Sequence, residues 1–321
     1  MNVPPKEFIR IMPDLLRSFT SKVFQAAGTS ATDGDRLAEL LVLTDLRGVF
    51  SHGTQQLAGY AEMMLSGKVN PKPRVECVDQ SQTTAVFDGD GGMGHLPAHL
   101  AAKTAVKMAK EVGIGAATTR NHFHFGSAGK YSRMALKEDC IGFAVSAHRF
   151  MPGAGASILS SSVASPMSFA IPTGDQPPIV LDMATSIHGS NDLFQAIPDA
   201  FFKFIGLGAT SHALGGFMAG IWLFDQQTNA DAWEGSNQGA FICAFDIARF
   251  RPIDEYKEEI DRHLSGIHQM QPAPGYDRAT LPGALEWERE REWSEIGVPV
   301  GKGHQEALTR VAQTFDLELP F

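Results

Sequence analysis

The spacing of apolar residues changes at Pro71 and Pro73, and this change limits the folds that the chain can adopt. Before the prolines, apolar side chains recur every three or four positions in segments 14–27, 37–46 and 55–65, which predicts three amphipathic helices. After them, short apolar runs bounded by glycine or proline alternate with further helical patterns. The chain is therefore expected to join a helical N-terminal part to an α/β part.

The α/β part is expected to run from residue 76 to residue 245. Its predicted strands are 83–88, 115–119, 141–146, 168–171, 179–182 and 239–245, and its predicted helices are 96–112, 128–138 and 202–222. Two polar-faced helices follow it, at 254–268 and 284–295. We expect residues 1–75 and 246–321 to pack together as a helical layer beside this unit.

The charge and composition of the chain argue against two classes of protein. With 27 basic and 36 acidic residues the net charge is −9, whereas a nucleic-acid binder needs a basic surface to neutralise phosphates. No run approaches the ~18 apolar residues that a membrane-spanning helix requires, and residues 1–20 lack the pattern of a signal peptide. The sequence thus predicts a cytoplasmic protein with no nucleic-acid or membrane partner.

The three cysteines, Cys77, Cys140 and Cys243, are widely spaced and form no Cys-x-x-Cys pair. An odd number of isolated cysteines does not indicate a disulfide framework or a zinc site. We expect three reduced thiols in or near the core.

A Ser-His pair follows the second predicted helix. The run from Arg47 to Gly53 ends that helix on a glycine and then presents Ser51 and His52 side by side. Because the imidazole of histidine titrates near neutral pH, small changes in its surroundings let it give or take a proton. The pair therefore predicts a general acid or base, although a histidine that only caps helix carbonyls is the simpler alternative.

The glycine-rich run from Gly89 to Gly94 has the spacing Gly-x-Gly-x-x-Gly of a Rossmann dinucleotide-binding loop. It also lies between a predicted strand and a predicted helix, as that loop requires. However, the next strand ends at Thr118-Thr119-Arg120, with no carboxylate to bind a ribose. The strand before the loop is also short and polar, so a Rossmann fold is not favoured.

Several stretches, in the order in which they occur, resemble the malate/L-lactate dehydrogenase family of NAD(P)-dependent oxidoreductases, which includes ureidoglycolate dehydrogenase and piperideine-2-carboxylate reductase. They are residues 47–53 with Tyr60, then 121–129, 178–186, 203–208, 237–250 and 281–283. The resemblance implies a non-Rossmann α/β fold with a largely antiparallel sheet and a cofactor-binding unit at residues 76–245. It also implies NAD(H) or NADP(H) as cofactor, a 2-hydroxy acid, 2-oxo acid or cyclic imino acid as substrate, and a homodimer.

The resemblance also assigns roles to particular residues. The catalytic residues that it implies are Ser51, His52 and Asp192, with His52 as proton donor or acceptor. The substrate-binding residues are Arg47, Gln56, Tyr60, His188 and Gly189. The cofactor-binding residues are His124, Gly126, Ser127, Gly129, Ser165, Asp182, Met183, Ala184 and Lys203. No metal is implied.

Two departures from the family pattern leave other functions open. Gln56 stands where the family has a substrate-binding arginine, and glutamine cannot replace the charge of a guanidinium group. The segment 186–203 is also shorter than its family counterpart. One alternative is therefore a non-catalytic member that keeps the fold for binding or assembly. Another is a metal-dependent hydrolase that uses His122 and His124, since alternate residues of a strand face the same side.

Overall fold

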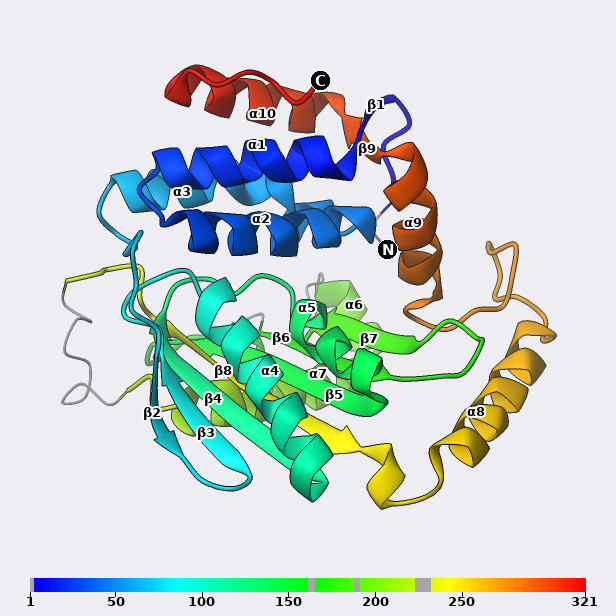
Figure 1. Cartoon of the computed structure of the whole chain (residues 1–321). Coiled ribbons are helices and arrows are strands. Elements are labelled where there is room, and N and C mark those ends of the chain that lie inside the picture. Colours follow the sequence, from blue (N-terminus) through cyan, green and yellow to red (C-terminus); the bar gives the residue numbers. More distant parts are fainter. Residues whose placement is uncertain (1–2, 161–164, 188–190, 223–231) are drawn as a thin grey trace.

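The computed structural model describes residues 3–160, 165–187, 191–222 and 232–321. Figure 1 shows a layer of helices above an α/β unit whose sheet carries helices on both faces. The fold expected from the sequence, an α/β fold with a largely antiparallel sheet, is confirmed. Among the described residues, no helix has the length and hydropathy needed to cross a membrane.

The helical layer combines helices from both ends of the chain. Its members are α1 (Pro13–Ala26), α2 (Ala31–Leu46), α3 (Leu57–Leu65), α9 (Ala284–Ile296) and α10 (Lys302–Phe315). A two-stranded antiparallel sheet ties the two ends together, because β1 (Phe8–Ile11) pairs with β9 (Val298–Gly301). Phe8 lies opposite Gly301 in this ladder, so two segments at nearly the full sequence separation of the chain are hydrogen-bonded.

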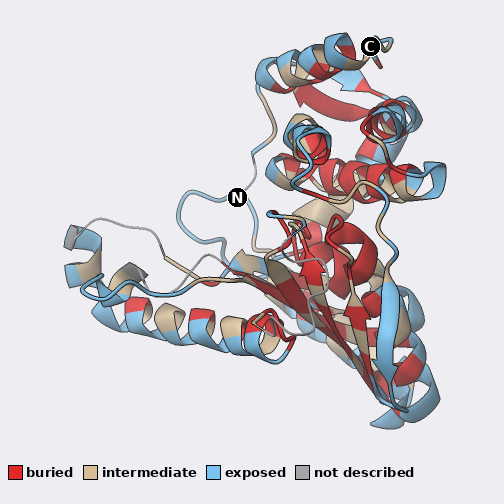
Figure 2. Cartoon of the chain, turned by 90° about the vertical axis from the view of Figure 1, so that its left-hand side faces the viewer, coloured by how far each residue is buried: buried red, intermediate tan, exposed pale blue. Residues whose placement is uncertain are grey.

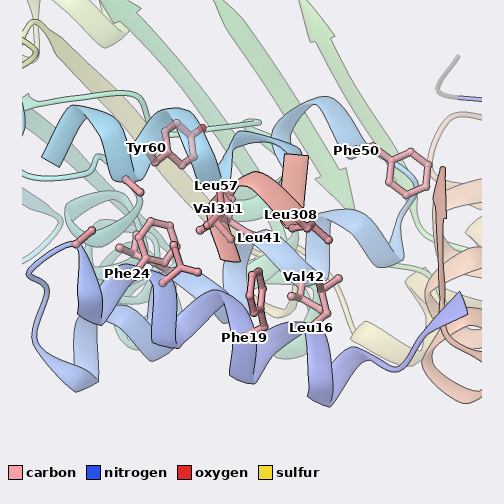
Figure 3. Close-up of a cluster of buried hydrophobic side chains, with 14 of the residues drawn as sticks. Leu16, Phe19, Phe24, Leu41, Val42, Phe50, Leu57, Tyr60, Leu308 and Val311 are labelled. Carbon is pink, nitrogen blue, oxygen red and sulfur yellow. The ribbon is translucent and has the colours of Figure 1, made fainter. Parts of the chain in front are cut away.

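Buried apolar side chains hold the helical layer together. Leu16 and Phe24 of α1, Leu41 of α2, and Leu308 and Val311 of α10 belong to one cluster (Figure 3), and none of them is more than 4% exposed. Burying a leucine or phenylalanine side chain stabilises a fold by about 1.5–3 kcal/mol. The apolar stripes that predicted the first three helices therefore face the same core, which α10 covers from the C-terminal side.

The α/β unit contains a seven-stranded sheet of order β2-β3-β4-β8-β5-β6-β7. Only β3 and β4 run parallel, and every other neighbouring pair is antiparallel. The strands are β2 (Glu76–Gln80), β3 (Thr84–Asp88), β4 (Ile114–His122), β5 (Cys140–His148), β6 (Pro166–Ile171), β7 (Ile179–Ala184) and β8 (Gln238–Asp246).

Helix α4 (His95–Val112) connects the two parallel strands and covers one face of the sheet. It approaches closely because its buried face is rich in alanine. A side chain at Gly115 of β4 would overlap the carbonyl oxygen of Ala105 in α4. The resulting interior is visible as the buried band along the sheet in Figure 2. On the opposite face lie α6 (Asn191–Ala196) and α7 (Pro198–His212), followed by a π-helical turn (Ala213–Phe217).

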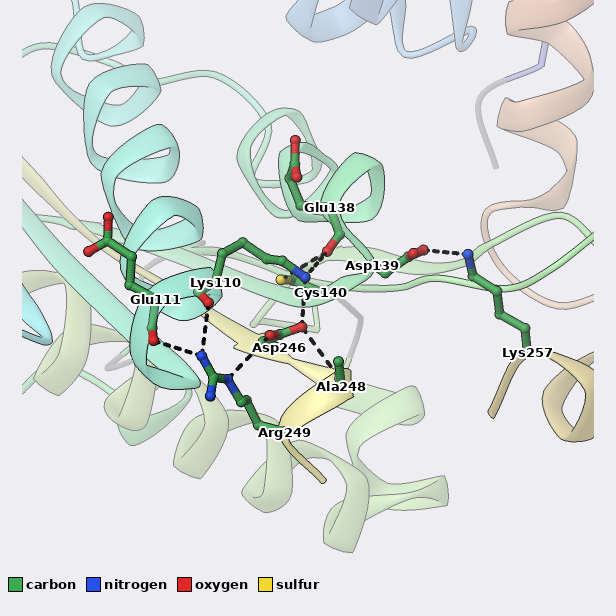
Figure 4. A network of polar contacts seen from close by, with 9 residues as sticks. All are labelled: Lys110, Glu111, Glu138, Asp139, Cys140, Asp246, Ala248, Arg249 and Lys257. Carbon is green, nitrogen blue, oxygen red and sulfur yellow. Dashed lines mark hydrogen bonds and ion pairs between the residues drawn. The ribbon is translucent and has the colours of Figure 1, made fainter. Parts of the chain in front are cut away.

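A buried carboxylate fixes the far end of α4 to the sheet (Figure 4). Asp246, 3% exposed at the end of β8, accepts a hydrogen bond from Lys110 Nζ at 2.9 Å and lies 3.8 Å from Arg249 Nε. Lys110 also donates to the carbonyl oxygen of Glu138 at 3.1 Å. This network is built from α4, β8 and the turn before β5, and it contains none of the predicted site residues.

The glycines of the run 89–94 are explained by close packing of this run against other segments of the protein. A side chain at Gly91 would overlap the ring of Trp233, and one at Gly92 would overlap Pro73. A side chain at Gly94 would overlap the carbonyl oxygen of Phe123. These glycines therefore allow segments of the protein to approach one another, which agrees with the non-Rossmann fold.

Some predicted elements were wrong in length or missing. The helix expected at 128–138 is one α-helical turn, α5 (Gly129–Ser132), followed by the 3-10 helix η3 (Arg133–Glu138), and the helix expected at 202–222 leaves α-helical geometry after His212. Cys77 is exposed on β2 rather than near the core, whereas Cys140 and Cys243 are buried. The spacing also missed β1, β2, β9, α6 and α10.

Helix α8 (Ile253–His268) contacts the turn between β6 and β7, where Asp261 accepts hydrogen bonds from the backbone of residues 174–175.

Candidate active site

His52 lies at the end of the short 3-10 helix η1 (Phe50–His52), just below the end of α2. Gly48 takes a positive φ of 77° and turns the chain out of α2. Ser51 Oγ lies 3.0 Å from His52 Nδ1, so the hydroxyl fixes the ring and leaves Nε2 as the other proton site. His52 is half-buried, and this burial, with the positive charge of Lys130, lowers the pKa of the imidazole below 6.5. At neutral pH it is therefore a neutral base.

Asp45, the last charged residue of α2, holds this loop through hydrogen bonds. It is fully buried, and its Oδ2 accepts hydrogen bonds from Thr54 N at 3.0 Å and Thr54 Oγ1 at 2.6 Å. Burial raises its pKa to about 7. Thr54 Oγ1 also lies 2.9 Å from His304 Nε2 of α10, which ties the loop to the helical layer. Gly53 has no room for a side chain, because a Cβ there would overlap Asp45 Oδ1.

The predicted substrate residue Tyr60 and the predicted cofactor residue His124 meet in front of His52. The Tyr60 hydroxyl lies 2.7 Å from His124 Nδ1, and the His52 and His124 rings are 5.8 Å apart. Burial and the neighbouring His52 lower the pKa of His124 to about 3. Segments 47–60 and 121–129, which are separate in the sequence, thus form one cluster.

Lys130, the second residue of α5, is buried in the middle of this cluster with 5% exposure. Its Nζ donates to the carbonyl oxygen of His52 at 2.9 Å and lies 3.3 Å from His95 Nε2 of α4. Burial lowers the pKa of its amine to about 7, although Asp45 and Asp182 act in the opposite direction. The sequence-based reasoning missed both Lys130 and Asp45.

Asp182 on β7 joins two of the predicted cofactor segments. Its carboxylate accepts a hydrogen bond from the backbone N–H of Gly129, and a side chain at Gly129 would crowd both Asp182 and Arg133. Although the side chain of Asp182 is open to solvent, it faces a cavity surrounded by protein, and this raises its pKa. Two predicted cofactor residues, Gly129 and Asp182, are therefore in direct contact.

The cavity has a volume of about 1060 Å³ and lies between β7 and the segment that precedes α9. Its walls include Val49 from the His52 loop, Arg133, Asp182, Pro282 and Glu286. Small-molecule sites in proteins typically measure about 300–1000 Å³ and combine apolar walls with a few polar groups. A second cavity of about 500 Å³, between Phe50 and the start of α10, is lined by none of the predicted site residues.

A comparison with known protein families identifies the family of this chain. A family model described as malate/L-lactate dehydrogenase matches residues 11–199 and 194–309. The chain belongs to the malate/L-lactate dehydrogenase family. The family predicted from the motifs is therefore confirmed.

Members of the malate/L-lactate dehydrogenase family are similar to this chain over nearly its whole length. Malate dehydrogenase of Pyrococcus horikoshii is 28% identical over 353 residues, covering 98% of this chain and 97% of that protein. The protein of Escherichia coli O157:H7 named ureidoglycolate dehydrogenase (NAD(+)) is 22% identical, covering 91% of this chain and 93% of that protein. A solved structure of the Pyrococcus horikoshii enzyme has a TM-score of 0.83 at 29% identity, covering 99% of each chain. Δ1-Piperideine-2-carboxylate reductase of Pseudomonas syringae shares the fold, with a TM-score of 0.72 at 20% identity over 95% of this chain and 99% of that one.

The family match is interrupted in the segment that departs from the family pattern. Its two parts meet at residues 194–199, and the alignment with the Pyrococcus enzyme is longer than this chain. Both observations agree with a shortened segment between 186 and 203. The predicted substrate residues His188 and Gly189 lie outside the described residues.

Other predicted residues lie apart from the cluster or have other partners. Asp192 on α6 and Lys203 on α7 are exposed. Gln56 donates to the carbonyl oxygen of Ser51 at 2.8 Å. Arg47 Nε and Nη2 bind Glu290 of α9 at 2.8 and 3.2 Å.

The remaining predicted cofactor residues lie around β7 and the loop before α5. Ser165 is buried, and its carbonyl oxygen accepts a hydrogen bond from Thr185 Oγ1 at 2.8 Å. Ser127 is also buried, Met183 is partly exposed and Ala184 is exposed. Gly126 takes a positive φ of 81° in the turn beside Lys130.

The structure gives no support to a metal site at His122 and His124. His122 Nε2 lies 2.8 Å from Thr119 Oγ1 and its Nδ1 lies 2.7 Å from the carbonyl oxygen of Phe123, so both ring nitrogens already have partners. No group of three or more metal-binding side chains occurs among the described residues.

The buried histidines predict a loss of stability in acid. Burial lowers the pKa of His122 and His304 to about 4 and that of His124 to about 3, against 6.5 when unfolded. Between about pH 6.5 and 4 the unfolded chain binds more protons, so the free energy of unfolding falls as pH falls. Asp45 acts in the opposite direction over pH 7 to 4, and so does Asp182, whose pKa is also raised, but the buried histidines outnumber them. We expect the thermal unfolding midpoint to fall steadily in this window; a midpoint that stays constant from pH 7 to 4.5 would contradict this reading.

Proposed function

We propose that this protein is a dehydrogenase that uses NAD(H) or NADP(H) to interconvert a 2-hydroxy acid and a 2-oxo acid, or a related cyclic imino acid. One observation carries the proposal. The loop that holds His52 also forms, through Val49, a wall of the cavity that contains Asp182 and Pro282. A proton-transfer group therefore lies next to a site of the size that a nicotinamide cofactor needs.

The residues around the cavity fit such a cofactor. Arg133 offers a cation to phosphate groups, and Val180, Leu181 and Val49 offer an apolar wall to a ring. When bound, the cofactor would accept or supply the hydride at C2 of the substrate. His124, Gly126, Ser127, Gly129, Ser165, Asp182, Met183, Ala184 and Lys203 remain our proposed cofactor contacts within the unit 76–245.

His52 handles the proton in this proposal. Because its pKa is lowered, the neutral imidazole can take the hydroxyl proton of a 2-hydroxy acid at Nε2 while Ser51 holds Nδ1. In the reducing direction the same nitrogen returns the proton to the carbonyl oxygen. Tyr60, whose hydroxyl is hydrogen-bonded to His124, is a proposed substrate-binding residue beside it.

The substrate is proposed to carry less negative charge than malate, or to bind differently. Gln56 is neutral and is bonded to the backbone of its own loop. Arg47 is held by two hydrogen bonds to Glu290, so its charge is already balanced. Asp192 remains our proposed catalytic residue of the segment 186–203, and His188 and Gly189 remain its proposed substrate-binding residues.

The alternative of a non-catalytic member rests on Gln56 and on the shortened segment 186–203. Such a protein would keep the fold and act by binding or assembly, without turnover. Turnover of any 2-oxo acid that disappears in the His52→Ala variant would reject this alternative.

A fluorescence titration of the purified protein with NADH and with NADPH tests the cofactor proposal. We expect saturable binding of at least one nucleotide, which also selects the cofactor for a screen of 2-oxo acids. Replacing Arg133 by methionine should weaken binding of the same nucleotide, while Arg36→Met, on α2 and paired with Glu39, should not. No saturation with either nucleotide at millimolar concentration would reject the proposal.

We further propose that the protein is a cytoplasmic homodimer, as the family resemblance implies. Light scattering coupled to gel filtration tests the dimer, and a mass equal to that of one chain would reject it.

A further inference from the structure

We propose that Lys130 is a positioning residue: its buried amine holds the peptide that carries His52 against the turn of the cofactor-binding loop. The inference rests on the proposed function of His52. It adds a residue that neither the motifs nor the departures from the family pattern single out.

The amine of Lys130 contacts three separate segments of the chain. It donates to the carbonyl oxygen of His52 in η1 and lies 3.3 Å from His95 Nε2 of α4. It also fills the space beside Gly126, because a side chain there would overlap Nζ. Lys130 itself is the second residue of α5, directly after Gly129 and the loop that carries His124. One buried group therefore links the proton-transfer residue to the cofactor-binding loop.

Asp45 holds the same peptide from the other side. It accepts hydrogen bonds from Thr54 N and Thr54 Oγ1, two residues after the carbonyl group that Lys130 holds. The loop 52–54 thus lies between a buried cation and a buried carboxylate. Burying a charged group is costly unless it is paired and hydrogen-bonded. A movement of the loop would break the hydrogen bonds of both groups, so the loop has little freedom to move.

The charge of Lys130 also acts on His52. Asp45 and Arg47 from α2 and its end and Asp182 from β7 act on the charge of Lys130, and His95 of α4 and His124 lie near both residues of the pair. The groups around these are Tyr60 of α3, His122 of β4 and Arg133 of η3, with Glu286 and Glu290 of α9 near Arg133. Burial lowers the pKa of His52, and the positive charge of Lys130 lowers it further, because the Lys130 amine is still protonated in the pH range in which His52 titrates. Removing that charge should raise the pKa of His52.

The test compares the full-length protein with the Lys130→Met variant, which keeps the length of the side chain and removes the amine. We expect kcat to fall by about 10- to 100-fold, because a small displacement of a reacting group has an effect of this size. The KM for the cofactor should change little, and the acid limb of the pH profile should move to higher pH. Lys110→Met is the matched control, since Lys110 also donates to a backbone carbonyl oxygen, that of Glu138, but it pairs with Asp246 at the far end of α4.

A second variant guards against loss of folding. Lys130→Met combined with Asp45→Asn removes both buried charges, so no carboxylate is left buried beside a missing cation. A folded variant, single or double, with the kcat and pH profile of the wild type would overturn the proposal.

An independent measurement separates this inference from the proposed function. The C–Hε1 signal of His52, assigned by its loss in His52→Ala, can be titrated by NMR whether or not the protein turns over any substrate. We expect its midpoint to be higher in Lys130→Met than in the wild type. If the wild type proves to be inactive but the midpoint rises, only the proposed function fails. An unchanged midpoint would overturn the role of Lys130.

Discussion

Replacing His52 by alanine is expected to lower kcat by about 10²- to 10⁴-fold, the usual contribution of a general acid or base. The imidazole is half-buried and oriented by Ser51. Cofactor affinity should be preserved, because His52 does not line the large cavity. Steady-state kinetics together with a nucleotide titration measure both effects.

His99 provides the matched control. It is another partly buried histidine with a lowered pKa, but it lies on α4 beside Arg36 and Lys103, away from the site. His99→Ala should keep the kcat of the wild type. If His52→Ala also keeps it, His52 is not the proton-transfer residue.

Replacing Gly53 by alanine is expected to lower the free energy of unfolding by about 1–3 kcal/mol, the typical effect of overpacking a filled interior. The added methyl group would overlap the buried carboxylate of Asp45, whose partners in Thr54 prevent it from moving freely. Because the same change shifts the peptide next to His52, activity should fall together with stability. Chemical denaturation and kinetics on the same preparation measure the two losses.

Gly59, six residues later on α3, is the control for this variant. Nothing lies within 4 Å of a Cβ at this exposed helical position. Alanine there should raise stability by about 0.5–1 kcal/mol, because glycine loses more backbone entropy in a helix. Equal stability changes at the two positions would show that crowding against Asp45 is not the cause.

Much of the fold could be predicted from local patterns. The stripes of α1, α2 and α4 and the apolar runs of β3 to β8 have the periods that their final environment requires. The strands that were missed have no such signal, whereas α10, with Leu308, Val311 and Ala312 buried on one face, has one. All five side chains of β2 are exposed, and β1 and β9 are four-residue strands that exist only because they pair with each other. Their formation is decided by distant partners, which a local pattern does not contain.

The candidate site was predicted where chemistry is carried by recognisable motifs, and missed where it depends on burial. Ser51, His52, Tyr60, His124 and Asp182 come from such motifs and lie in one region. Asp45 had a usable signal, since it continues the buried series of Leu37 and Leu41 on the same face of α2. The sequence indicates Lys130 more weakly. Its position is buried by contacts with His52 of η1 and His95 of α4, which lie far from it in the sequence. The positions of Asp192 and Lys203 depend on the shortened segment, and a motif match does not predict how that segment folds.

The pairing of β1 with β9 has a consequence for the synthesis of the protein. A ribosome completes α1, α2 and α3 early, but β9 and α10, which cover them, are made after the entire sheet. The apolar faces around Leu16 and Leu41 must wait for the last part of the chain, and closing so long a loop is entropically slow. The α/β unit is therefore expected to fold first, with the nascent helices exposed to chaperones and to aggregation until translation ends.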